Sequence, residues 1–312
     1  MYDKRGGMAS NKKIIGTILL LLSSMQLAVA QQMPQYAQYM FNPLAINPAV
    51  AGGEEVLSLG FINRDQWSGV ENAPKTQTLM AHSSFVNQNL GLGLVLTHDK
   101  IGVHKNLFAS VAPAYHLKTG KQSTLSFGAQ LNVIHQRSDY PSLMQNGTVD
   151  PNLAQAVNSL YADFGFGFFF RSKNFQLGLS APSFLSHREN PSDTASFEVD
   201  NAHYFVFSRY TITMNPYWKV QPGFLIRYTP DLQTAFDVNA NIIYRNVLTL
   251  GASYRSEKSL TTLLMAQASK QLQLGYAYDF ALGDVALPRT GSHELMLKYV
   301  FRYNTHNISS PR

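Results

Sequence analysis

Apolar and polar residues alternate along most of this chain in segments of about ten residues, and this pattern constrains the fold more than any other feature. In TAFDVNANIIY (residues 234–244), apolar side chains occupy every second position from Phe236, while polar ones fall between them from Asp237. The segments QLQLGYAYDF (271–280) and STLSFGAQLNV (123–133) repeat the alternation. Alternation over this length, bounded by turn residues, is typical of a transmembrane β-strand with one lipid-facing side.

The composition fits a membrane β-barrel. Charged residues make up only 14% of the 312 residues, against roughly 25% in ordinary soluble domains, while Tyr (16) and Phe (19) are abundant. Mean hydropathy is nevertheless −0.13, as expected when polar residues alternate with apolar ones. Cysteine is absent, which excludes disulfides, thiolate metal sites, a cysteine nucleophile and a lipoprotein anchor. The alternative is a soluble β-sandwich or barrel with the same alternation, although its charge content is usually higher.

The spacing of the alternating segments predicts roughly 14 strands. They begin near Glu55, Gln77, Leu90, Leu107, Ser123, Leu160, Asn174, Ala202, Trp218, Thr234, Val247, Leu260, Gln271 and His293. The even-numbered connections are short, and the longest ones are odd-numbered: 64–76, 137–159, 182–201 and 282–292. Bacterial outer-membrane barrels combine an even strand number with short periplasmic turns and longer extracellular loops. We therefore predict an all-β fold, a transmembrane antiparallel up-and-down β-barrel over residues 54–303, with both chain ends in the periplasm.

Residues 1–30 are predicted to be a secretory signal peptide. Two lysines precede an apolar core at residues 14–22, and the small residues 28–30 form a cleavage site. Removing the signal takes away four basic residues and one acidic residue, so the formal net charge falls from +6 to +3 and gives no argument for nucleic acid binding. Either Met1 or Met8 is the start of translation, and residues 304–312 are expected to be a C-terminal tail.

Motifs of soluble enzymes are absent, with no phosphate-binding loop, GxSxG or HExxH. His82 and Ser84 share one face of a predicted strand, so a barrel-wall lipid hydrolase is one hypothesis, but the sequence identifies no third group to orient them. We expect no catalytic residue, no metal site and no cofactor. The ionisable residues on polar strand faces, such as Asp237, Asp279 and Lys298, have mixed signs, which favours internal pairing over a selectivity filter.

Several motifs resemble one known family. The segment QYAQYMFNPLAINPAVAG (35–52) closely resembles the start of the PorP/SprF family of type IX secretion membrane proteins in Bacteroidetes. The likeness continues in order through RDQWSGVENAPKTQT (64–78), LGLGLVLTHDKIG (90–102), GLSAPSFL (178–185), LGASYR (250–255), LGYAYDFALG (274–283) and GSHELMLKY (291–299). It departs at Glu71 and Asn72, where the family more often has a Gly-Ala type of lead-in, and at Val50, where an aromatic residue is common.

The resemblance implies a non-enzymatic outer-membrane barrel of the type IX secretion and gliding apparatus. It implies membrane lipids and periplasmic ring or lipoprotein components as partners, and in some members a large secreted surface adhesin. Whether this chain is a general component or is dedicated to one adhesin stays open. The alternative function is a passive or hydrophobic-solute channel, since barrels of about 14 strands can hold an occluded lumen.

Residues 31–53 form an irregular segment before the first strand, rich in Gln, Tyr, Asn and Pro. We expect it to pack into the periplasmic mouth of the barrel, with Asn47 and Pro48 forming a turn. Its large side chains would then be anchors, either in the lumen or at a partner surface, because Tyr and Met are enriched at interfaces. These candidate anchors are Tyr36, Tyr39, Met40 and Phe41.

The outer loop RDQWSGVENAPKTQ is the second candidate site. Its Arg64 and Trp67 either receive a secreted partner or constrict the lumen. Inward packing is the commoner fate of a long barrel loop, which favours constriction.

Overall fold

The computed structural model describes residues 34–54, 56–85, 89–143, 156–184, 202–230, 233–282 and 290–301. The predicted signal peptide and C-terminal tail therefore lie outside the described residues. In these described ranges no helix is long and apolar enough to cross a membrane.

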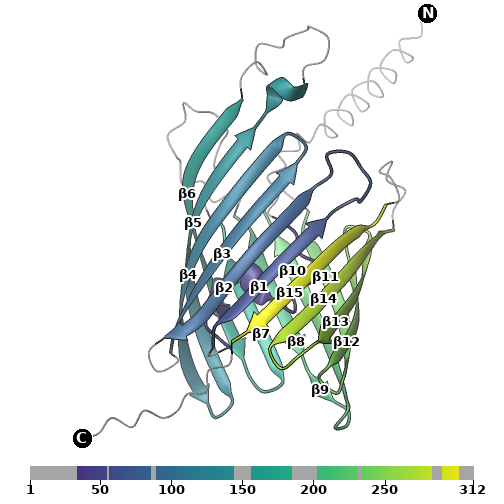
Figure 1. Ribbon diagram of the computed structural model, residues 1–312. Coiled ribbons are helices and arrows are strands. Elements are labelled where there is room, and N and C mark those ends of the chain that lie inside the picture. The colour runs from purple at the N-terminus through teal and green to yellow at the C-terminus, as the bar shows by residue number, and fades with distance from the viewer. Residues whose placement is uncertain are drawn as a thin grey trace, which may run out of the picture. The chain divides into compact units, whose positions relative to one another are not determined.

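The described chain is a closed antiparallel β-barrel (Figure 1). Its strands are β1 (Ser58–Asp65), β2 (Lys75–Phe85), β3 (Leu90–Ile101), β4 (His104–Gly120), β5 (Ser123–Ser138), β6 (Val157–Arg171), β7 (Phe175–Ala181), β8 (Tyr204–Tyr210), β9 (Ile212–Thr213), β10 (Trp218–Tyr228), β11 (Ala235–Tyr244), β12 (Leu248–Arg255), β13 (Ser259–Gln267), β14 (Leu272–Ala281) and β15 (Ser292–Val300). Short β9 continues β8 after one residue and both pair with β10, so the wall has 14 strands. Each strand pairs with its sequence neighbours, and β1 pairs with β15 to close the ring. The predicted fold and strand number are confirmed.

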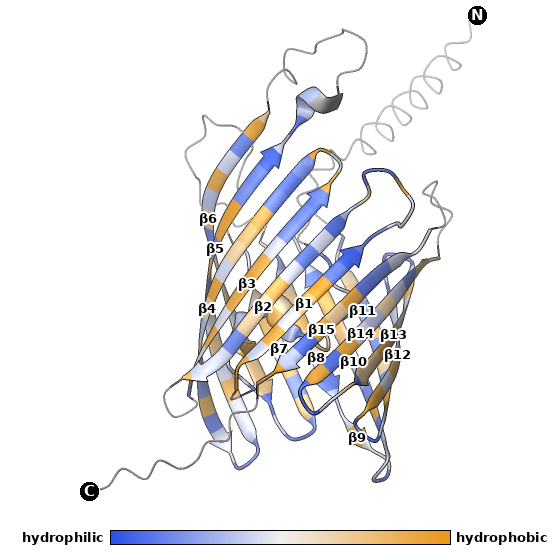
Figure 2. Ribbon diagram, in the orientation of Figure 1, coloured by the Kyte–Doolittle hydropathy of each residue, from blue (hydrophilic) through white to orange (hydrophobic). Residues whose placement is uncertain are grey.

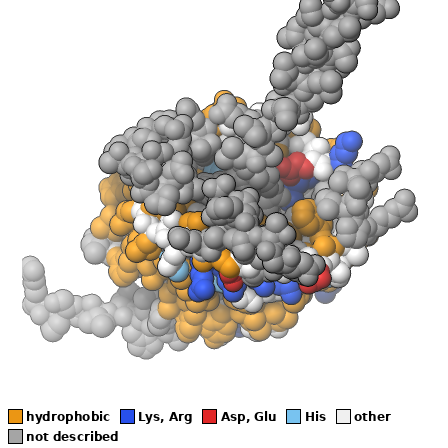
Figure 3. All heavy atoms as spheres, turned by 90° about the horizontal axis from the view of Figure 1, so that it is seen from above, with side chains coloured by type: hydrophobic (Ala, Val, Ile, Leu, Met, Phe, Trp, Pro, Cys, Tyr) orange, Lys and Arg blue, Asp and Glu red, His pale blue; other side chains and the backbone are white. Residues whose placement is uncertain are grey.

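The two faces of the wall invert the pattern of a soluble protein. On β11 the side chains of Asp237 and Asn241 are almost completely buried, whereas Phe236 and Val238 are about half exposed. Figure 2 shows the resulting alternation of orange and blue along the strands. From above, the visible wall is hydrophobic and the visible charged side chains lie at its upper rim (Figure 3). The outward apolar face suits contact with lipid, and the inward polar face lines a lumen.

The connections define two ends of the barrel. The even-numbered ones have two to four residues and lie at what we call the short-turn end; the odd-numbered ones lie at the long-loop end and include 66–74, 139–156, 182–203 and 282–291. Three odd connections are also short. Two of these, near Asp231 and Glu257, are apparent in the sequence, but the third is a tight turn at residues 102–103, where β4 starts earlier than predicted. The short-turn end is the one that faces the periplasm in bacterial outer-membrane barrels.

A charged residue on the lipid-facing side of the wall should destabilise the fold by an amount that depends on its depth in the membrane. Leu131 points outward from β5 within its apolar stretch, and we expect Leu131→Arg to lower the free energy of unfolding in liposomes by about 2–4 kcal/mol. Leu160 also points outward, but it pairs in register with the polar His135 near the long-loop end. At that position Leu160→Arg should lower the free energy of unfolding by less than about 1 kcal/mol. Urea unfolding of both variants tests this, and equal costs would contradict a membrane-embedded wall.

Candidate functional site: the luminal plug and the cavity beneath it

Residues 34–54, which we call the luminal plug, lie inside the barrel, and part of this purple segment is visible behind β1 in Figure 1. The plug contains two short 3-10 helices, η1 (Pro43–Ala45) and η2 (Pro48–Val50), and no strand. Tyr39 and Met40 are each only 1% exposed. Hydrogen bonds and ion pairs connect the plug to strands around the ring, from β2 through β6 and β8 to β11, β12 and β15. The plug is therefore integrated with the wall.

The amino end of the plug is held in the long-loop half of the barrel. The carboxylate of Glu294 on β15 accepts hydrogen bonds from the backbone N–H groups of Ala37 (2.7 Å) and Gln38 (2.9 Å). Glu294 is fully buried, and its charge is balanced by Arg64, whose guanidinium lies 3.3 Å from Glu294 and 2.5 Å from Asp279. One buried ionic cluster thus joins the plug to β1, β14 and β15. The plug accordingly reaches from the short-turn end into the long-loop half of the lumen.

Arg64 and Trp67 do not form a common loop site. Arg64 belongs to β1, and its side chain is 4% exposed inside the lumen, so the expectation that it lies in the outer loop is wrong. β1 includes Arg64 and continues to Asp65, because the Arg64 guanidinium pairs inside the lumen with the carboxylates of Asp279 on β14 and Glu294 on β15. Trp67 does lie in the connection, with a positive φ of 50°, and its backbone N–H donates to Oγ of Ser292 at 3.1 Å. Its side chain is half-buried.

The carboxyl end of the plug is held at the short-turn end. Oδ1 of Asn47 accepts the Ala49 N–H at 2.9 Å and caps η2, which begins at Pro48. Nδ2 of Asn47 donates to the carbonyl oxygens of Phe168 (3.0 Å) and Leu179 (3.3 Å) on β6 and β7. The expected turn at Asn47 and Pro48 is therefore a single 3-10 turn, and the Asn47 side chain holds it against β6 and β7 by hydrogen bonds.

Glycines in the wall make room for this close approach. A Cβ at Gly128 on β5 would lie 2.3 Å from the backbone nitrogen of Ala49, and one at Gly91 on β3 would lie 2.0 Å from the carbonyl oxygen of Ala51. Neither atom is the end of a flexible side chain, so any larger residue would force the plug backbone to move. These inward glycines are a signal in the sequence that something other than water occupies the lumen.

Burial sets the ionisation of two plug tyrosines, and an ion pair sets that of a plug glutamate. The hydroxyl of Tyr36 lies 2.9 Å from Oγ1 of Thr78, and that of Tyr39 accepts from Nδ2 of Asn239 at 2.8 Å. Burial raises the pKa of both hydroxyls, so they remain neutral hydrogen-bonding groups. Burial alone would also raise the pKa of the Glu54 carboxyl, but its ion pair with the Lys298 ammonium outweighs that effect and the pKa is lowered. Glu54 is thus held as an anion.

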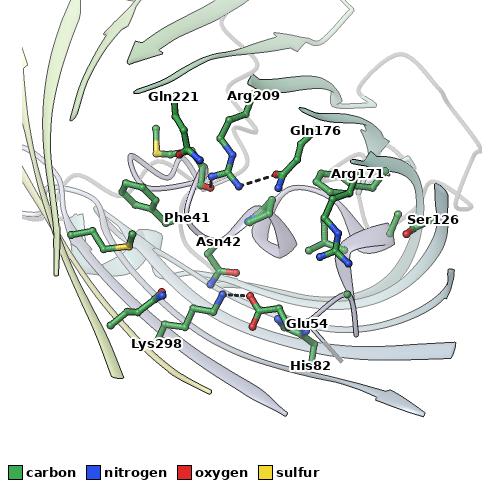
Figure 4. A pocket seen from close by; sticks show the side chains of 18 of the residues that line it. Phe41, Asn42, Glu54, His82, Ser126, Arg171, Gln176, Arg209, Gln221 and Lys298 are labelled. Atoms are coloured by element: carbon green, nitrogen blue, oxygen red, sulfur yellow. Dashed lines mark hydrogen bonds and ion pairs between the residues drawn. The ribbon is translucent and has the colours of Figure 1, made fainter. Parts of the chain in front are cut away.

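A cavity of about 280 Å³ lies below the plug at the short-turn end (Figure 4). Phe41 and Asn42 of the plug form part of its lining, and Phe41 is half-buried there. The opposite lining comes from the lower parts of the strands and includes Arg171, Arg209 and Lys298. Sequence reasoning missed these three residues as a group, because they lie on β6, β8 and β15, which only barrel closure brings around one space.

His82, one of the two residues considered for hydrolysis, contacts the plug. Nδ1 of His82 accepts a hydrogen bond from the backbone N–H of Gly52 at 3.2 Å, and Ser84 makes no hydrogen bond with His82. Within the described part of the chain, no cluster of His, Cys, Asp or Glu could hold a metal ion. Several luminal charges are instead paired, as their mixed signs predict, with Asp237 between Arg227 (2.9 Å) and Arg255 (3.4 Å).

Comparison with known families assigns the chain. The model of the type IX secretion system membrane protein PorP/SprF matches residues 28–299. The chain belongs to the PorP/SprF family. The resemblance seen in the sequence motifs is thereby confirmed, and this PorP/SprF protein is a membrane component of a type IX secretion system.

Solved structures similar to this PorP/SprF protein include outer-membrane barrels. The crystal structure of Acinetobacter baumannii outer membrane protein Omp33 matches with 9% identity and a TM-score of 0.46, covering 79% of this chain and 98% of that one. The KdgM porin matches with 10% identity and a TM-score of 0.39 over 78% and 99% of the two chains. A mutant of the Rh. blastica porin has 10% identity and a TM-score of 0.35, over 79% and 99%. No curated protein gives a significant match.

Glu294 is the residue whose loss should most affect the plug. Glu294→Gln removes a buried negative charge beside Arg64 and one of the two acceptors of the plug N–H groups. Because Asp279 still faces Arg64, we expect a loss near the low end for a broken buried pair, about 3 kcal/mol in the free energy of unfolding. Urea titration of folded protein in detergent measures it.

Glu257→Gln is the matched control. Glu257 also accepts from an arginine, Arg227 at 3.3 Å, but its side chain is 46% exposed at the long-loop rim. An exposed pair contributes less than about 1 kcal/mol, so this variant should unfold almost as the parent does. Equal losses in the two variants would show that the Glu294 cluster does not hold the plug.

Proposed function

We propose that this PorP/SprF protein is a non-enzymatic outer-membrane component of the type IX secretion apparatus. In this role it binds periplasmic ring or lipoprotein components, or supports the export and surface attachment of a large adhesin. The family match over residues 28–299 carries the proposal, because it spans the plug and almost the whole barrel. The fold agrees with a role in a membrane-embedded assembly, since its outward apolar face requires a lipid bilayer.

The plug supports a binding role over passive conduction. An open diffusion pore needs a continuous wet path, whereas here Tyr36, Tyr39, Met40 and Leu44 fill the inside of the barrel with buried side chains. The ion pairs in the long-loop half of the lumen point the same way, because a conducting filter presents unpaired charge to the solute. A passive or hydrophobic-solute channel would instead require the plug to leave. Single-channel recording of the purified protein separates the two functions, and steady conductance would favour the channel.

The direct test is crosslinking. The tagged protein, expressed at its native level, is crosslinked in intact cells, purified from outer membranes and analysed by mass spectrometry. Recovery of periplasmic ring proteins would support a general role, and recovery of one large surface protein would support a dedicated one. Recovery of unrelated porins alone would contradict the proposal.

Deleting residues 31–41 tests whether the plug is an anchor or a partner surface. The deletion removes Tyr36, Tyr39 and Met40, each of which stabilises the fold by about 1.5–3 kcal/mol through burial. Because these side chains face the lumen, we expect the folded form to convert to the unfolded form at a clearly lower temperature on semi-native gels. We expect recovery of crosslinked partners to be unchanged. Deleting residues 304–312 is the control; lost partners with unchanged heat resistance would make the segment a partner surface.

A further inference from the structure

The cavity at the short-turn end carries an excess of positive charge. Among the residues that line it, the cations are Arg171, Arg209 and Lys298, and the only carboxylate is that of Glu54. With His82 and His116 counted as neutral, the lining has a net charge of +2, from three cations and one anion. A concave surface with walls of low dielectric constant focuses such a potential and attracts an anion.

Two of the three cations already have partners. Lys298 forms an ion pair with Glu54. Nη1 of Arg209 donates to the carbonyl oxygen of Met40 at 2.7 Å, and its Nη2 donates to Oε1 of Gln176 at 2.9 Å. Arg209 therefore connects the plug to β7 through hydrogen bonds. No carboxylate of a described residue neutralises its positive charge.

Arg171 is different. It ends β6, and Figure 4 shows its guanidinium pointing into the cavity with no interaction drawn to it. Its Nη1 lies close to the plug, 3.7 Å from where a Cβ on Gly53 would be. No described residue accepts a hydrogen bond from this side chain or pairs with its charge. A half-buried guanidinium with five free N–H donors is suited to bind a carboxylate or phosphate in two parallel hydrogen bonds.

Amide side chains complete the lining on the β10 and β14 sides. Nε2 of Gln221 donates to Thr211 at 2.9 Å, and Nε2 of Gln273 donates to Gln267 at 2.7 Å. Their Oε1 atoms accept no hydrogen bond from a described residue. Carbonyl acceptors of this kind match the N–H groups of a peptide backbone, and a bare phosphate ion would have no use for them. Phe41 adds an aromatic surface to the same lining.

We propose that this cavity binds a peptide segment that bears a carboxylate. Arg171 binds the carboxylate, Arg209 adds to the local potential, and Gln221 and Gln273 accept hydrogen bonds from the peptide backbone. A volume of about 280 Å³ is near the lower limit of ligand pockets, which fits the last two or three residues of a peptide. Lipid head groups do not reach the site from the side, because the closed wall separates the lumen from the bilayer.

The inference rests on the proposed function for the source of the peptide, since the short-turn end would admit a segment of a periplasmic partner. The binding itself is a property of the purified chain. Failure of the crosslinking experiment and failure of the binding experiment are therefore separate results: the first concerns the assembly, and the second concerns the cavity.

The test measures fluorescence anisotropy with the full mature chain in detergent. The probe is a fluorescein-labelled hexaglutamate peptide with a free carboxyl terminus, compared with its C-terminally amidated form and with an amidated hexaglutamine peptide. We expect hexaglutamate to bind and amidated hexaglutamine to bind at least about tenfold more weakly, because charge-assisted hydrogen bonds are the strong ones. A difference between the two hexaglutamate forms identifies the chain terminus as the bound carboxylate; equal binding identifies the side chains.

Arg171→Gln should weaken hexaglutamate binding by about tenfold or more, and Arg171→Lys should retain part of the affinity because it keeps the charge. Lys173→Gln is the matched control, since Lys173 is an exposed cation two residues away in the same turn; it should change affinity by less than about twofold. Heat-dependent migration on semi-native gels verifies that each variant is folded.

Three results would overturn the proposal. These are no binding of hexaglutamate to the parent protein, equal binding by the Arg171→Gln and Lys173→Gln variants, and displacement of the peptide by inorganic phosphate at the same concentration. The last result would identify a site for small anions.

Discussion

A β-sheet inside a bilayer has to close, because lipid offers no partner to the unpaired N–H and C=O groups of a sheet edge. The pairing of β1 with β15 meets this requirement, and everything else in the molecule follows from it. Closing 14 strands leaves a lumen too wide for the wall's own side chains to fill. The polar face that alternation places inward must then be hydrated, paired with itself or covered by another part of the chain.

This protein uses the last two solutions together. Arg64 with Asp279 and Glu294, and Asp237 with Arg227 and Arg255, pair charge within the wall. The plug supplies backbone groups to what remains, as when the N–H groups of Ala37 and Gln38 bind Glu294 or the Met40 carbonyl accepts from Arg209. A segment with no strand and only two single-turn 3-10 helices is well suited to this task, because most of its N–H and C=O groups are not used in a regular ladder. Its irregular sequence, rich in Asn, Gln and Pro, thus has a structural reason.

The wall could be predicted from the sequence because each strand's pattern is local. Alternation around Phe236 and Asp237 defines two faces without knowledge of any other strand, and the spacing of such segments gives the strand number. Arg64 could not be placed in this way, because a charged residue beside Asp65 looks like the start of a loop, and its partners Asp279 and Glu294 are more than two hundred residues away in the sequence. The same holds for Arg171, Arg209 and Lys298, whose grouping depends on register and closure. Gly91 and Gly128 could be predicted in part. The alternation shows that both face inward, but it does not show that the plug backbone packs against them.

The plug and the closure of the barrel are energetically coupled. The plug contacts strands on both sides of the β1–β15 pairing. Tyr36 is hydrogen-bonded to Thr78 on β2, and the N–H groups of Ala37 and Gln38 donate to Glu294 on β15. These contacts exist together only when the seam is paired, so the plug stabilises the closed ring more than any open sheet. Conversely, the plug backbone lies directly against the wall at Gly91 and Gly128. Small side-chain movements would therefore not let the plug enter a barrel that had already closed. The segment that precedes β1 therefore belongs to the barrel's core, although it is not part of its wall, and a change that weakens either one is expected to weaken the other.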